Sequence, residues 1–144
     1  MAQETFAEFL RDDIAPILRE MGFRGSGRRY TLPHSDRYAV VAFQTQRTKL
    51  ADRVKFTVNV SVVGKRQWEA ARASDPSLPE IPSAVLRYGP ESGVWHRRLG
   101  SLVDGHERWW TLHESGTKRA LVAHDVLATI SGVIVPALVE RLAD

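Results

Sequence analysis

The sequence predicts an α+β fold in which an antiparallel sheet of about five strands carries the N- and C-terminal helices on one face, as a two-layer sandwich. Three observations predict it. Both ends of the chain show helical periodicity, the middle contains a strictly alternating strand, and the connections between strands are short, which favours antiparallel neighbours. A length of 144 residues fits one domain, residues 1–144.

The first helix is expected from Glu4 to Met21, because its apolar residues recur mostly at steps of three and four. Gly22 follows directly and suits the left-handed position that often ends a helix. Pro16 lies inside the pattern and has no N–H to donate, so we expect either a kink there or a fresh helical turn that begins near Ala15.

Two strands and a charged connection should follow this helix. Gly25 to Gly27 reads as a flexible entry to a short strand from Arg29 to Leu32. A longer strand is expected from Tyr38 to Gln46, and Arg47 to Arg53 should connect it to the next one.

The clearest strand is Val54 to Val63. Valine or phenylalanine occupies every even position from 54 to 62, and a polar residue occupies every odd position from 55 to 61. This alternation is typical of a sheet with one face in the core and the other in water. We therefore expect Phe56 to be buried and Asn59 to be exposed.

The second half of the chain should hold one short helix, a loop and two more strands. Lys65 to Ala73 is expected to be helical, and the three prolines within residues 74–84 indicate a surface loop. Val94 to Leu99 and Arg108 to His113 read as strands, and the Asp104-Gly105 pair between them predicts a hairpin.

The last helix should begin at Ser115 or Thr117 and run to about Leu142, with a bend at Pro136. Its most apolar run, Val126 to Val139, is shorter than the ~20 residues that span a bilayer. We therefore expect no membrane contact.

Composition and charge restrict the function further. The chain has no cysteine, which excludes disulfides, thiol catalysis and thiolate metal sites and fits a cytoplasmic location. Between Arg24 and Arg66 lie ten of the 20 Lys/Arg residues but only two of the 17 acids. Such asymmetry can steer an anionic partner, although a solvated basic surface would look the same.

No residue pattern indicates catalysis, a metal or a cofactor. The Ser-x-x-Lys match at Ser115 has no companion motif and is explained by helix capping. No two histidines have metal-ligand spacing, and Asp12 and Asp13, as helical neighbours, point in different directions. The sequence therefore predicts that the chain is not an enzyme.

The polar face of the sheet is the candidate binding surface. Gln44 should share it with Thr57 and Asn59, where amides either bond one another across strands or meet a partner. Trp109 and Trp110 must point to opposite faces, so one enters the core and the other is a partner anchor or lies under the loop. The candidate contacts are Arg29, Gln44, Gln46, Lys55, Thr57, Asn59, Arg98 and one of Trp109 or Trp110.

Two classes of partner fit this surface. Another protein is the first, which makes the chain a protein-binding module. Nucleic acid is the alternative, because Tyr30 and Tyr38 lie among the arginines, although the RNP1 pattern is missing. The oligomeric state is not predicted.

Several short motifs in order resemble domain-of-unknown-function family 4304 between Ile14 and Leu112. These motifs comprise Pro16, Leu18, Gly22 and Phe23; Phe43 and Gln44; Phe56 to Asn59; Trp95 and Arg98; and Trp109 and Trp110. The resemblance implies a small bacterial cytosolic domain without an established activity or catalytic residues. Small size and the missing catalytic set also resemble the immunity proteins of contact-dependent toxin systems, an analogy of size and fold alone.

Overall fold

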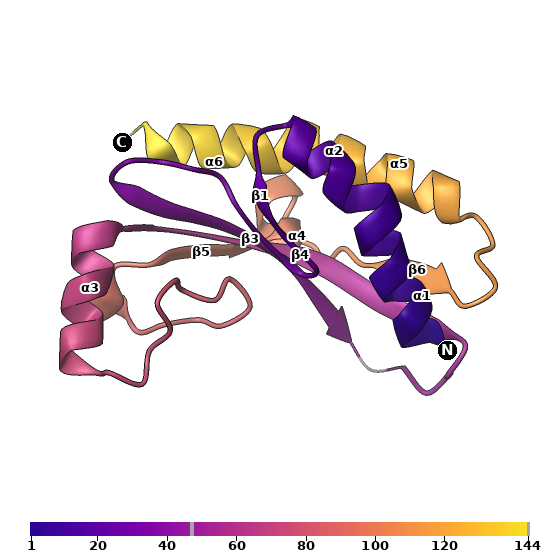
Figure 1. Cartoon of the computed structure of the whole chain (residues 1–144), viewed down its shortest axis with the longest axis horizontal. Coiled ribbons are helices and arrows are strands. Elements are labelled where there is room, and N and C mark those ends of the chain that lie inside the picture. The colour runs from indigo at the N-terminus through magenta and orange to yellow at the C-terminus, as the bar shows by residue number, and fades with distance from the viewer. Residues whose placement is uncertain (47, 144) are drawn as a thin grey trace.

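The computed structural model describes residues 1–46 and 48–143, which contain a six-stranded antiparallel sheet (Figure 1). The strands are β1 (Arg24–Ser26), β2 (Arg29–Thr31), β3 (Arg37–Gln46), β4 (Arg53–Gly64), β5 (Trp95–Arg98) and β6 (Trp110–His113). They follow the order β1-β2-β3-β4-β5, and β6 also pairs with β4. The predicted α+β class is confirmed. Arg47, in the expected charged connection, lies outside the described residues.

The N-terminal helix consists of α1 (Ala2–Phe9), the π-helical turn η1 (Leu10–Ile14) and α2 (Ala15–Glu20). Pro16 is accommodated by this wider turn, in which the Ala15 N–H donates to the Leu10 carbonyl five residues earlier. The irregularity expected at the proline is therefore a π turn just before it.

The C-terminal helix repeats this arrangement with α5 (Arg119–Thr129), η3 (Ile130–Ile134) and α6 (Val135–Leu142). The Val135 N–H donates to the Ile130 carbonyl, directly before Pro136. The helix spans 24 residues and is long and apolar enough, by length and composition alone, to cross a membrane. The apolar length expected from the sequence was shorter, because it included only the most apolar run of the helix. A stripe of this helix is nevertheless buried in the core, comprising Val126, Ile130, Ile134 and Leu138.

The main core lies between these helices and one face of the sheet, which we call the helix face (Figure 1). Phe56 is fully buried there, with its ring centroid 5.0 Å from that of Phe6 and 5.8 Å from that of Phe9. Every even position from 54 to 62 is buried, as the alternation predicts.

Most of the segment expected to be a flexible entry is instead a paired strand, because Gly25 and Ser26 belong to β1, while Gly27 lies in the turn that follows. Gly25 lies opposite Tyr30 in an antiparallel hairpin of β1 and β2. Gly25 has φ of 128°, and a Cβ atom there would collide with the Arg29 carbonyl oxygen. Glycine therefore allows the close approach of the two strands, and flexibility is not its role.

The predicted hairpin around Asp104-Gly105 is wrong. β5 leads into the short helix α4 (Leu99–Val103), and the Gly105 N–H donates to the Gly100 carbonyl at 2.8 Å. Gly105, with φ of 85°, therefore ends a helix. Instead of pairing with each other, β5 lies beside residues 59–62 of β4 and β6 beside residues 53–56.

The opposite sheet face, which we call the second face, is partly covered by α3 (Lys65–Ser74) and the following loop, which includes η2 (Pro90–Ser92) (Figure 1). Trp68 is fully buried and its indole N–H lies 3.0 Å from the Pro79 carbonyl oxygen. Ala84 packs on Val40 and Ala42 in a second, smaller core. The helix face thus has a complete helical layer, whereas a single helix and its loop cover part of the second face.

Candidate functional site

The predicted binding residues of strands β2 to β5 all share the second face. Gln44 is opposite Thr57, Gln46 is opposite Lys55, and Arg98 is opposite Asn59. Arg29 lies opposite Ala42, so its side chain projects to the same face. Side-chain alternation along the strands thus brings together residues far apart in the sequence.

Gln44, Asn59 and Arg98 form one hydrogen-bonded group. The Asn59 amide nitrogen donates to Gln44 Oε1 at 2.7 Å, and Arg98 Nη2 donates to the same oxygen at 3.3 Å. Arg98 Nε donates to Asn59 Oδ1 at 3.4 Å. The expectation that the two amides could bond each other is therefore confirmed, and Arg98 joins them.

Arg98 also connects this group to Trp109. Its Nη1 donates to Glu107 Oε1 at 3.0 Å, and Trp109 Nε1 donates to Glu107 Oε2 at 2.6 Å. The guanidinium carbon of Arg98 lies 5.7 Å from the Trp109 ring centroid, and Lys55 Nζ lies 6.0 Å from it. The hydrogen bond from Trp109 and the Arg98 guanidinium lower the pKa of Glu107, so its carboxylate is ionised at neutral pH.

The expectation that Thr57 and Asn59 face water is wrong. Both side chains point to the second face, but both are 0% exposed. Thr57 Oγ1 donates to the Arg108 carbonyl at 2.7 Å, because the chain leading into β6 passes over it. Thr57 and Asn59 therefore support the surface from beneath, and a partner would not touch them.

The two tryptophans separate as the strand geometry predicts. Trp110 lies on the helix face, stacked on Phe56 with a centroid distance of 5.5 Å, and its Nε1 donates to Asp125 at 2.7 Å. Trp109 lies on the second face and is partly exposed. Trp109 is therefore the candidate anchor of the pair. We call the group Gln44, Gln46, Lys55, Arg98, Glu107 and Trp109 the Trp109 surface.

A groove adjoins the Trp109 surface where the loop after α3 approaches β2 and β3. Its cavity of about 410 Å³ is lined by residues that include Arg28, Arg29, Gln44, Thr45, Ile81 and Val85, and we call it the arginine groove. Arg28 is among the lining residues, but its guanidinium is directed to α1 on the helix face. Its Nη1 donates to Thr45 Oγ1 at 3.1 Å, its Nη2 donates to Gln3 Oε1 at 3.0 Å, and its guanidinium carbon lies 5.3 Å from the Phe6 ring centroid. Gln44 belongs to both sites, so they form one continuous region.

Sequence reasoning missed Glu107, Arg28 and the loop residues Ile81 and Val85. Apolar residues among the prolines of residues 74–84 were a signal that this loop packs on something. The position of Glu107 has no such signal, since it depends on β5 and β6 sharing one edge of β4.

This region combines ionised, amide and aromatic side chains. Within residues 1–46 and 48–143, no group of three His, Asp or Glu residues is arranged to hold a metal ion. Hydrogen bonds lower the pKa of Asp52, Asp104 and Glu107, but all three are exposed. Aromatic residues and arginine are enriched at protein interfaces, whereas lysine and glutamate are depleted there.

The fold and this surface define a small α+β domain with a polar, aromatic second sheet face. The family described as "Domain of unknown function (DUF4304)" matches residues 14–140, and the chain belongs to this family. No curated protein and no solved structure matches the chain.

Proposed function

We propose that the chain is a protein-binding module whose partner docks on the Trp109 surface and the arginine groove. The position of Trp109 carries this proposal. Its indole lies outside the main core, beside two cations and hydrogen-bonded to Glu107. Tryptophan and arginine are the residue types most enriched among those that dominate binding energy at protein interfaces.

The partner should present acidic and amide groups. Arg29, Lys55 and Arg98 bring three cations to this region, and Glu107 brings a carboxylate. Complementary charge accelerates association and selects among partners. A toxin bound by an immunity-like protein in the bacterial cytosol is one partner of this kind, and a toxin gene beside the encoding gene would support it.

Nucleic acid is the second candidate, favoured by the excess of Lys and Arg between Arg24 and Arg66. Base stacking needs exposed aromatic faces. Tyr30 is fully buried, and Tyr38 is only partly exposed, with Lys65 Nζ 5.4 Å from its ring centroid. The second face therefore offers fewer stacking platforms than the basic sequence suggests.

The test compares the wild-type chain with Trp109→Ala and Leu121→Ala as immobilised baits in lysate from the organism that encodes it. Leu121 is exposed on α5, on the helix layer, so its replacement controls for loss of apolar surface elsewhere. A protein retained by wild type and Leu121→Ala is then purified and its Kd is measured. Trp109→Ala should weaken that Kd by roughly 30-fold, which corresponds to an interface residue worth about 2 kcal/mol.

Equal affinity of wild type and Trp109→Ala would refute the proposed surface. Fluorescence anisotropy with labelled single-stranded RNA and DNA examines the alternative. Nucleic-acid binding that declines steeply with salt, without any selective protein partner, would favour the second candidate and reject the first.

A further inference from the structure

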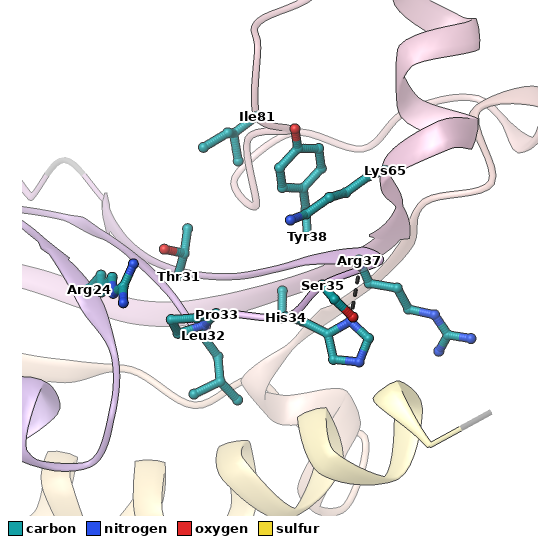
Figure 2. Close-up of a pocket in the computed structure, with 11 residues that line it drawn as sticks. Arg24, Thr31, Leu32, Pro33, His34, Ser35, Arg37, Tyr38, Lys65 and Ile81 are labelled. Carbon is teal, nitrogen blue, oxygen red and sulfur yellow. Dashed lines mark hydrogen bonds between the residues drawn. The ribbon is translucent and has the colours of Figure 1, made fainter.

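A second cavity opens at the beginning of β3, at the far end of the second face from Gln44. Its volume is about 490 Å³, within the range of small-molecule sites. Arg24, Thr31, Tyr38, Lys65 and Ile81 are among its lining residues (Figure 2). Gln44 is six residues further along β3 than Tyr38, or about 20 Å at 3.3 Å per residue, so this cavity is separate from the Trp109 surface.

Three cationic residues line this cavity, namely Arg24, Arg37 and Lys65. Arg37 Nη1 donates to the Arg141 carbonyl at 2.7 Å, whereas Arg24 and Lys65 lie on different sides of the cavity (Figure 2). The β1–β2 hairpin places Arg24 opposite Thr31. The Lys65 N–H donates to the Asp36 carbonyl at 2.8 Å, which fixes the start of α3 beside the β3 turn. Lys65 Nζ then lies 5.4 Å from the Tyr38 ring centroid, and Figure 2 shows it extending over this ring toward the side where Thr31 lies.

The charge of the cavity is not balanced by its lining. Among the described residues that line it, none is an aspartate or glutamate. Within the described part of the chain, neither the Arg24 nor the Lys65 side chain has a hydrogen bond or ion pair. An anion bound in this cavity would be attracted by both of these cations.

We propose that this cavity binds a small organic molecule that carries a phosphate group. A phosphate monoester has a charge of about −1.5 to −2 at neutral pH, which matches the two cations, and its oxygens accept several hydrogen bonds. Thr31 supplies a hydroxyl donor. Tyr38 and Ile81 supply an aromatic ring and an aliphatic wall for the organic part of the ligand.

Isothermal titration calorimetry with three probes tests this proposal: inorganic phosphate, adenosine monophosphate and adenosine. The titrations use the full chain, and the variants are Lys65→Gln and Arg24→Gln. Arg66→Gln is the matched control, because Arg66 is the exposed neighbour of Lys65 and does not line the cavity. Circular dichroism and the thermal midpoint confirm that each variant is folded.

We expect saturable binding of adenosine monophosphate, weaker binding of phosphate and no binding of adenosine. Lys65→Gln and Arg24→Gln should each weaken binding by about tenfold or more, equivalent to about 1.4 kcal/mol, while Arg66→Gln should leave it unchanged. Absence of saturable binding of both phosphate probes would overturn the proposal. An equal loss in Arg66→Gln would also overturn it, because the binding would then reflect net charge. A single-stranded oligonucleotide binding more tightly than the mononucleotide, with the same variant pattern, would reassign the cavity to nucleic acid.

Discussion

Asn59 is shielded from water and hydrogen-bonds both Gln44 and Arg98, so its replacement should lower the free energy of unfolding. Asn59→Ala removes both bonds, so the half-buried Arg98 Nε loses its acceptor and Gln44 Oε1 keeps only its bond from Arg98 Nη2, a loss that typically costs about 1–3 kcal/mol. Gln46→Ala, at an exposed position of the same face, should change the free energy of unfolding by less than about 0.5 kcal/mol. Urea denaturation of both variants provides the measurement. Equal effects would show that the group contributes nothing to stability.

Phe56 is surrounded by four aromatic rings. Truncation of its side chain to alanine would therefore leave a cavity between the sheet and α1. Those rings belong to Phe6, Phe9, Phe43 and Trp110. Phe56→Ala should therefore destabilise the chain by about 3–5 kcal/mol. Phe56→Leu preserves most of the volume and should cost clearly less. A small loss for the alanine variant, measured by chemical denaturation, would contradict this packing.

Alternation along β4 predicted which face each residue points to, but it could not predict exposure. Thr57 and Asn59 look like solvent-facing residues in the sequence because they are polar. Their burial results from Arg98 and the Arg108 backbone, which reach them only after β5 and the chain before β6 settle on the same edge of β4. The face to which a side chain points is a local property of its strand, whereas the burial of that side chain depends on segments distant in the sequence.

At the scale of elements, both long helices place a π turn directly before a proline. The wide turn removes the need for a proline N–H, so the proline should be nearly neutral there. Pro136→Ala should change the free energy of unfolding by no more than about 1 kcal/mol. Ala128→Pro, at an exposed position inside α5, should cost about 3 kcal/mol or more because it breaks a regular turn. Thermal and urea unfolding compare the two, and a large loss in Pro136→Ala would refute the role assigned to the turn.

The presence of each helix and strand was easier to predict from the sequence than the pairing of the strands. Helical periodicity located both terminal helices, and alternation of apolar and polar residues located β4, because each pattern depends only on residues that are close in the sequence. The Asp104-Gly105 pair was misread, since a glycine with positive φ suits both a hairpin and a helix end. Only the helical turn formed by Leu99–Val103 decides between them, and five residues are too few for a periodic signal.

At the scale of the whole molecule, the layer on the helix face followed from the sequence, but the cover of the second face did not. A loop containing several prolines is ordinarily expected to lie over the surface, without a core of its own. Here Trp68 and Ala84 bury it against the sheet, and both candidate cavities lie along its edges, with Ile81 lining each of them. The candidate sites therefore depend on tertiary packing of a segment that has almost no regular structure.

The attachment of this loop should weaken in acid. The Nε2 atom of His96, on β5, lies 2.7 Å from the Ala84 carbonyl oxygen. Burial lowers the pKa of His96 below the ordinary value of 6.5, and the nearby Arg87, Arg98 and Arg97 lower it further. The hydrogen bond to Ala84 acts in the opposite direction and raises this pKa. Between those two pKa values the unfolded chain binds more protons than the folded chain, so the free energy of unfolding must fall as the pH drops through 6.5.

We expect the urea midpoint of the wild type to decrease between about pH 7.5 and about pH 5.5, a window above the titration of the exposed carboxylates. His96→Gln keeps a donor for the Ala84 carbonyl but cannot titrate, so its midpoint should change less over the same range. Limited proteolysis within residues 75–94 at both pH values locates the effect, with faster cleavage of the wild type in acid. Parallel pH profiles of wild type and His96→Gln would assign the acid sensitivity to another group and contradict the role given to His96.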